Sequence, residues 1–387
     1  MRRILYLDRT SEIGGAESSL LLLLRHLDRN RYDPLVVLPG DGSLNRELSR
    51  LGVPTQVVPL HTLNVKALNP FPYLDTVWRL RGIIRRERVD LVHANDLTAN
   101  QYGVVAARLA GRPIICHLRN LCNGTAVKRG LLAWSDHLIA NSQAVRETYL
   151  ACNPTPQKVT VIYNGVDLSD YNSYGEDGAG FRRRFDVPED VFLLGIVGRV
   201  LAAKGHHILI RALTEVARNH REDVRLAIIG PADGPANGKF QRDEQFVAEL
   251  RQSIRALGLN ECVSFWGEQR DMAPVYRALD LLVLPTFEEG FGRVLIEAMS
   301  AERPVVASAV GGTVEVVEAG ATGLLVPPGD VEKLAEAICT LASNPEMARH
   351  MGIEGRKRVE RLFTIQQNVA GTEALYERIL SCRGRSA

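Results

Sequence analysis

Two glutamates, Glu289 and Glu297, flank a Gly-Phe-Gly turn in the stretch EEGFGRVLIEAMS. A helix is expected over Phe291–Ser300, so Glu289 precedes it and Glu297 lies about two turns inside it. The two carboxylates therefore do not form a side-by-side pair, but they can reach different parts of one extended ligand. Gly290 and Gly292 leave free amides at the helix start, which favours an anion. The alternative interpretation is one acid that complements the helix N-terminus and one on the surface.

A second glycine-bearing turn carries two permanent cations. In GIVGRVLAAKG, Gly198 ends an expected strand, and Arg199 and Lys204 flank the loop before a helix that starts near Gly205. A guanidinium grips phosphate oxygens in a fork and an ammonium acts as a point charge, so this pair suits a diphosphate. The loop is not a Walker loop, because G-x-x-x-x-G-K-[ST] is absent from the chain. A solvated Arg–Lys pair is the alternative.

A third turn, SEIGGAESSL, follows the first expected strand and opens a helix. Gly14 and Gly15 let backbone N–H groups approach an anion at that helix N-terminus. The spacing is not G-x-G-x-x-G, and no acidic residue follows the second strand in the ribose position. These two differences disfavour a nicotinamide cofactor and leave a plain tight turn as the alternative.

The elements that must position these turns alternate between short apolar runs and helical patterns. Strand–helix alternation predicts an α/β protein with parallel, doubly wound sheets, which bind ligands beyond the carboxyl ends of their strands. Two such Rossmann-like domains would face a cleft. We expect the first domain over 1–170, a polar linker over 171–188, the second domain over 189–364, and a C-terminal helix over 365–387 that packs back on the first domain.

Composition limits the class of partner. A chain of 387 residues is long enough for two domains, and its six cysteines include no C-x-x-C pair, which suits a reducing cytoplasm. No targeting or membrane-spanning segment is visible in the sequence. Residues 1–165 hold 21 Lys and Arg against 13 Asp and Glu, a net charge of +8. A basic first half favours an anionic partner or a membrane surface; nucleic acid is disfavoured because no recognised binding motif is present.

Several separated segments, taken together, resemble the retaining glycosyltransferases of family 4, which have the GT-B architecture. In chain order they are GGAE, DLVHA, PIICH, VIYNGVD, GRVLAAKG, LGLNECVSFWG and EEGFGRVLIEA. The E-x7-E element of the family is Glu289–Glu297 here. The resemblance covers nearly the whole chain, and it implies an acceptor in the first domain and a nucleotide-sugar donor in the second.

The resemblance also implies roles for single residues of the second domain. Arg199 and Lys204 match the cations that hold the donor diphosphate. Glu289 matches the acid that contacts donor-sugar hydroxyls, and Glu297 the acid that binds the nucleotide ribose. The remaining donor-binding residues are expected to act through backbone amides that meet the sugar and phosphate: Gly290, Phe291, Gly292 and Arg293.

In the first domain, the resemblance implies that Gly15, with Gly14 beside it, approaches the diphosphate. His117, which ends PIICH, matches the active-site histidine beside the transferred sugar. A histidine that ends a buried strand is otherwise more often a hydrogen-bonded core residue. Arg119 and Asn120 follow it and are candidate acceptor contacts.

One residue of the second domain departs from the family pattern. Arg293 stands where the family often has an apolar or small residue, and its side chain could reach phosphate or acceptor.

The expected reaction is metal-independent transfer with retention. Sugar–phosphate cleavage passes through an oxocarbenium-like transition state, and charge grows on the leaving diphosphate. His117, Glu289, Arg199 and Lys204 are the expected catalytic residues; no cofactor or metal is expected, since the chain has no D-x-D pair at a strand end. A UDP-sugar is the first expectation for the donor and a GDP-sugar the second. A covalent intermediate and same-face attack both remain open, and we favour the second.

The acceptor expected is a glycan or a lipid-linked acceptor. The basic stretch RLRGIIRRER (79–88) suggests peripheral contact with the inner face of the membrane, although a solvated helix face is the alternative. Two rival functions remain: a GT-B sugar-nucleotide epimerase, which needs no acceptor, and a sugar-nucleotide-binding scaffold without catalysis.

Overall fold

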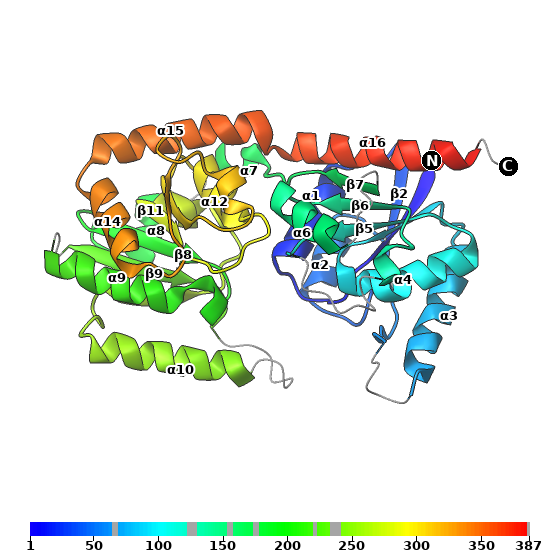
Figure 1. Ribbon diagram of the computed structural model, residues 1–387, viewed down its shortest axis with the longest axis horizontal. Helices are drawn as coiled ribbons and strands as arrows, with labels where there is room; N and C mark the ends of the chain where they lie inside the picture. Colours follow the sequence, from blue (N-terminus) through cyan, green and yellow to red (C-terminus); the bar gives the residue numbers. More distant parts are fainter. Residues whose placement is uncertain are drawn as a thin grey trace. The chain divides into compact units, whose positions relative to one another are not determined.

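The computed structural model describes residues 1–63, 69–121, 130–152, 158–172, 178–219, 223–232 and 241–384 (Figure 1). The chain forms two compact units. Unit 1 combines residues 1–165 with the C-terminal segment from residue 364, and unit 2 comprises Val166–Phe363.

Unit 1 is built on a seven-stranded parallel sheet in the order β3-β2-β1-β4-β5-β6-β7. Successive side chains of a strand point to opposite faces, so β1 supplies Ile4 and Tyr6 to one core and Leu5 and Leu7 to another. A sheet with an apolar core on each face must carry helices on both. The elements are β1 (Arg2–Leu7), α1 (Gly15–His26), β2 (Tyr32–Leu38), α2 (Ser43–Arg50), β3 (Thr55–Val57), α3 (Phe71–Arg86), β4 (Leu91–Ala94), α4 (Leu97–Ala110), β5 (Ile114–Leu118), β6 (His137–Ala140), α6 (Gln143–Cys152), β7 (Val159–Val161) and α16 (Ile365–Gly384).

The last helix, α16, is part of the core of unit 1. It contributes Ile365, Leu375 and Tyr376 to the same apolar cluster as α1. A close approach also joins α16 to the end of the β7 segment, because a side chain at Gly165 would clash with the backbone of Ile365. The last helix therefore completes the unit that the first residues begin.

Unit 2 repeats the architecture with a six-stranded parallel sheet in the order β10-β9-β8-β11-β12-β13. Two doubly wound, parallel α/β domains confirm the predicted fold class. The elements are α7 (Leu168–Asn172), α8 (Gly178–Arg184), β8 (Phe192–Val197), the 3-10 turn η2 (Ala202–Lys204), α9 (His206–Asn219), β9 (Val224–Ile229), α10 (Gln241–Ala256), β10 (Val263–Gly267), α11 (Ala273–Ala278), β11 (Leu281–Leu284), α12 (Arg293–Ser300), β12 (Val305–Ser308), α13 (Thr313–Val316), β13 (Leu324–Val326), α14 (Val331–Ala342) and α15 (Pro345–Leu362).

The polar segment interpreted as a linker, 171–188, belongs to unit 2 instead; its residues 173–177 lie outside the described part. Here α8 buries Arg182, whose guanidinium donates to the carboxylate of Asp280 and to the carbonyl of Ala278, the latter at 2.8 Å. A charged side chain thus fastens α8 to the loop before β11, and the unit begins at Val166 rather than near residue 189.

Candidate functional site

The loops with the donor motifs leave the carboxyl ends of β8 and β11, two adjacent strands of unit 2. From β8 the chain goes outward to β9 and β10, and from β11 it goes the other way to β12 and β13. Such a switch in strand order separates the two loops and leaves a place for a ligand between them.

Backbone hydrogen bonds fix these two loops to each other. The carbonyl of Ala203 accepts from the N–H of Phe287 at 3.0 Å and from the hydroxyl of Thr286 at 3.0 Å. Gly205 has φ +76°, and a side chain there would clash with the carbonyl of Pro285. Glycine is required at this point because the backbones meet directly.

Lys204 and Glu289, predicted from separate motifs, form an ion pair. The Lys204 ammonium donates to Oε2 of Glu289 at 2.7 Å, with the two side chains 30% and 17% exposed. The pair is partly accessible, so a diphosphate can compete for the ammonium and a sugar hydroxyl for the carboxylate. Arg199 is exposed on the loop after β8, behind Gly198 with its φ of +140°.

Glu297 is held on both carboxylate oxygens. Oε1 accepts from the guanidinium of Arg293 at 2.9 Å, and Oε2 accepts from the hydroxyl of Tyr276 at 2.7 Å. Burial, together with the charge of Glu297, raises the pKa of Tyr276 well above its ordinary value, so this hydroxyl stays a donor. A carboxylate has about four acceptor positions, which leaves lone pairs for ribose hydroxyls. Arg293, which is predicted to reach phosphate or acceptor, donates to Glu297 in this structure.

The start of α12 differs from the predicted helix by two residues. Gly292 caps the helix at φ +91°, and Arg293 is its first residue. The side chain of Phe291 is buried and packs edge-on against Phe363, with ring centroids 5.6 Å apart. Phe291 can therefore meet a ligand only through its backbone, as expected.

Two glycines after β12, which were not predicted, support the loop that carries Glu289. The N–H of Gly312 donates to the carbonyl of Glu289 at 3.0 Å. Side chains at Gly311 and Gly312 would clash with the carbonyls of Glu289 and Gly290, respectively. The third loop thus supports the backbone that carries Glu289. Tyr276 was also missed, because one tyrosine on α11 has no spacing signal.

In unit 1, the GGAE turn begins α1 after β1. The carboxylate of the buried Glu17 accepts from the N–H of Gly14 at 2.9 Å, so one helix-start amide is already bonded within the protein. Among the described residues, a side chain at Gly15 would meet no atom within 4 Å, and the φ of Gly15 is ordinary. Neither packing nor backbone conformation demands glycine at position 15, which leaves room for a ligand as the reason.

His117, the candidate active-site histidine, is buried on β5 and stacks on His93 of β4, with ring centroids 5.8 Å apart. Neither ring nitrogen of His117 has a hydrogen-bond partner among the described residues. Burial, aided by the charge of Arg119, lowers the pKa of His117 well below its ordinary value. His93 is different: its Nδ1 lies 2.5 Å from the hydroxyl of Tyr376, as a hydrogen-bonded core histidine would. The stack sets a neutral, unpartnered imidazole at the end of β5.

Of the two candidate acceptor contacts, Arg119 is hydrogen-bonded within unit 1 and Asn120 is exposed. The guanidinium of Arg119 donates from Nε to the carbonyl of Asn95 at 2.9 Å and from Nη1 to the side-chain oxygen of Asn164 at 3.4 Å. Asn95 in turn donates to Asp8 at 2.6 Å, so Arg119 belongs to a network that the sequence did not indicate.

Asp8 makes the stability of unit 1 depend on pH. Burial, then the charge of Glu17, raises the pKa of Asp8 to about 7 from 3.8. Protonated Asp8 favours the folded state; this contribution is complete below pH 3.8 and is lost as the pH rises through about 7. The lowered pKa values of His93 and His117 have the opposite effect, because they make the folded state more stable as the pH rises. The contribution of Asp8 is therefore isolated only by comparing the wild type with a variant at position 8.

We therefore expect Asp8→Asn to gain stability relative to the wild type as the pH rises from 4 to 7, by at most about 1.4 kcal/mol per pH unit. Urea denaturation of both proteins across this range measures the difference. A difference that stays constant with pH would contradict the raised pKa.

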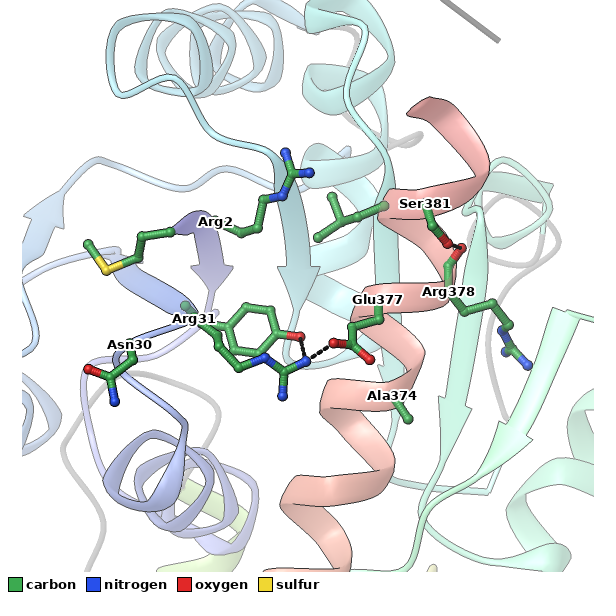
Figure 2. A pocket seen from close by; sticks show the side chains of 10 residues that line it. Arg2, Asn30, Arg31, Ala374, Glu377, Arg378 and Ser381 are labelled. Carbon is green, nitrogen blue, oxygen red and sulfur yellow. Dashed lines mark hydrogen bonds and ion pairs between the residues drawn. The ribbon is translucent and has the colours of Figure 1, made fainter. Parts of the chain in front are cut away.

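A hollow of about 710 Å³ lies elsewhere in unit 1, at the amino end of the sheet (Figure 2). Arg2 at the start of β1, Arg31 beside β2 and Arg378 of α16 line it. Because the GGAE turn and His117 lie at the carboxyl ends of their strands, this hollow is separate from them.

Within the described ranges, no group of three or more His, Cys, Asp and Glu side chains could hold a metal ion. None of the described helices has the length and apolar character that a membrane span needs.

Family models match both units. Residues 13–170 match the model described as Glycosyltransferase Family 4, and residues 180–358 match that of Glycosyl transferases group 1. The D-inositol 3-phosphate glycosyltransferase of Segniliparus rotundus is 34% identical over 315 residues, which is 76% of this chain and 67% of the relative. The D-inositol 3-phosphate glycosyltransferase 1 of Catenulispora acidiphila is 30% identical over 66% of this chain.

The match covers 64% of the Catenulispora relative, so the chain spans about two thirds of the length of these proteins. The crystal structure of Anabaena Alr3699/HepE in complex with UDP-glucose is similar over 97% of this chain and 100% of that one, with a TM-score of 0.84 and 28% identity. The order of motifs, the two doubly wound units and these similarities agree: the chain belongs to glycosyltransferase family 4, a family of enzymes with the GT-B fold.

Proposed function

We propose that this protein transfers a sugar from a UDP-sugar to a glycan or lipid-linked acceptor, with retention and without a metal. The Lys204–Glu289 ion pair carries the proposal, because it joins a phosphate-binding cation and a sugar-binding acid at the switch in strand order. The likeness to Alr3699/HepE, whose structure holds UDP-glucose, favours UDP over GDP.

In the proposed reaction, the donor separates this ion pair. The diphosphate takes the ammonium of Lys204, with Arg199 as a second cation, and both stabilise the charge that grows on the leaving group. Glu289 is then free to accept hydrogen bonds from the sugar, while Glu297 holds the ribose. In the absence of the donor, the pair keeps both side chains in position.

Retention is proposed to follow from attack on the face that the diphosphate leaves. In the donor complex Glu289 is proposed to accept hydrogen bonds from the sugar hydroxyls, and Glu297 is bonded by Arg293 and Tyr276, so neither carboxylate is assigned as a nucleophile. His117 is assigned to the side of the transferred sugar. We place the protein in the cytoplasm, where it meets its acceptor at the inner face of the membrane. The relatives named for D-inositol 3-phosphate make a phosphorylated cyclitol the second candidate acceptor.

The test is calorimetric titration with UDP, GDP and ADP in EDTA, on the wild type and on Lys204→Ala. We expect UDP to bind most tightly, and Lys204→Ala to weaken UDP binding about tenfold to hundredfold, since a hydrogen bond to a charged group contributes about 1.5–3 kcal/mol. The matched control is Lys357→Ala, which removes an exposed lysine that also pairs with a glutamate, Glu354.

Unchanged affinity in Lys204→Ala would contradict the phosphate role. Failure of all three nucleotides to bind would contradict the donor proposal, and binding without transfer to any added acceptor would favour the scaffold. Product analysis with UDP-glucose distinguishes the remaining rival, because an epimerase converts the sugar nucleotide with no acceptor present and a transferase requires one.

A further inference from the structure

The outer face of α3 exposes large apolar side chains. Phe71 is 74% exposed, Trp78 56% and Leu74 42%. At 100° per residue these three positions fall within a sector about 60° wide. The opposite face is buried in unit 1 through Tyr73, Val77, Leu80, Ile83 and Ile84. Helix α3 is therefore apolar on two sides, and packing within unit 1 accounts for only one of them.

Cations flank this apolar stripe along the second half of the helix. By helical spacing Arg81 falls on one edge of the stripe and Arg85 falls within it, and neither has an ion-pair partner among the described residues. The guanidinium of Arg81 lies over the ring of Trp78, 5.0 Å from its centroid. On the other edge, Arg79 is paired with Asp75 at 2.7 Å, so its charge is compensated.

The stripe continues onto neighbouring elements. Nε of Arg81 donates to the carbonyl of Leu109, at the end of α4, at 3.3 Å. One residue earlier, Arg108 donates to the carbonyl of Trp134 at 2.9 Å. Leu109 and Trp134 are themselves about half exposed. We call Phe71, Leu74, Trp78, Arg81, Arg85, Leu109 and Trp134 the α3 face.

We propose that the α3 face docks on a bilayer surface that contains anionic lipid. Indole and phenyl rings insert among the headgroups and upper acyl chains, while arginine stems lie along apolar surface with their guanidinium groups at the phosphates. Apolar area and cations then act together, as interfacial helices require. This docking proposal rests on the proposed function, because a lipid-linked acceptor would lie in the membrane.

A bilayer fits this face better than a second copy of the chain. In a symmetric dimer the same patch would meet itself, and one contact would gather the arginines of both copies with no acidic partner from the α3 face. A bilayer with anionic lipid offers phosphates across its surface and so matches a stripe that carries cations.

The test is co-sedimentation of the full chain with vesicles of one part phosphatidylglycerol to two parts phosphatidylcholine, and with phosphatidylcholine alone. We expect binding only with the anionic lipid, weakened by salt. Phe71→Ser with Trp78→Ser should lower partition roughly tenfold or more. Arg81→Gln with Arg85→Gln should lower it about 25-fold, since each cation changes partition about fivefold.

Controls come from unit 2: Leu257→Ser removes an exposed apolar residue, and Arg218→Gln an exposed cation. Both should bind vesicles like the wild type. Far-UV circular dichroism of every variant reports folding, and UDP affinity tests the proposed function separately. Absence of vesicle binding in a protein that binds UDP would overturn the docking proposal alone. Self-association that the α3 substitutions abolish, without vesicle binding, would also overturn it and identify a second copy as the occupant.

Discussion

Glu289→Gln is expected to lower the rate of sugar transfer by about a hundredfold to a thousandfold, the loss seen when one group that stabilises a transition state is removed. The substitution keeps the shape and most hydrogen-bonding capacity of the side chain but removes its charge. UDP affinity should stay the same or rise slightly, because the ammonium of Lys204 no longer has Glu289 as a competing partner.

Two measurements distinguish this outcome: initial rates with UDP-glucose and acceptor, and calorimetry with UDP alone. Glu288→Gln is the matched control, since Glu288 is the exposed neighbour in the same loop. Near-wild-type turnover in Glu289→Gln would remove Glu289 from the reaction. An equal loss in Glu288→Gln would point to general loop damage.

Arg182→Ala is expected to destabilise unit 2 by about 3 kcal/mol, the lower end of the range for breaking a buried ion pair on one side, because the Asp280 side chain is 33% exposed. The guanidinium is buried and donates to Asp280 and to the carbonyls of Ala278 and Val191. Alanine would remove the cation from the Asp280 carboxylate, which keeps the N–H of Leu193 at 2.7 Å, and would remove a donor from both carbonyls. Urea denaturation followed by far-UV circular dichroism measures the change.

The neighbouring Arg183→Ala is the matched control. Arg183 is exposed on the same helix, so its loss should change the free energy of unfolding by less than about 0.5 kcal/mol. If the two variants unfolded at the same urea concentration, Arg182 would have no special part in fastening α8.

Arg182 also shows where prediction from the sequence fails. Buried strands of a parallel sheet read as short apolar runs, such as RILYL at β1 and GLLVP at β13, so the strand–helix alternation could be predicted in both units. Among the described strands, the three-residue β3 at the sheet edge, TQV, has no such run. The stretch FRRRF looks like a charged surface, because nothing local reveals that the first of three arginines meets Asp280, 98 positions away.

In the candidate site, too, features with a local sequence pattern could be predicted and contacts between distant residues could not. Glycine turns at strand ends have a local signature, so the loops with Lys204 and Glu289 could be predicted, although their ion pair could not. Tyr276 and Gly312 act on those loops from other elements and have no local signature. For the same reason, the hydrogen bond from Arg293 to Glu297 was not predicted.

The membership of α16 in unit 1 has a consequence for the order in which the protein is made. During synthesis, residues 166–363 emerge as a complete unit, whereas residues 1–165 still lack the helix that supplies Ile365 and Tyr376 to their core. The unit that begins the chain is thus the last that can finish folding. A ribosome that stops at residue 363 releases all of unit 2, together with a unit 1 in which one apolar cluster lacks the residues of α16.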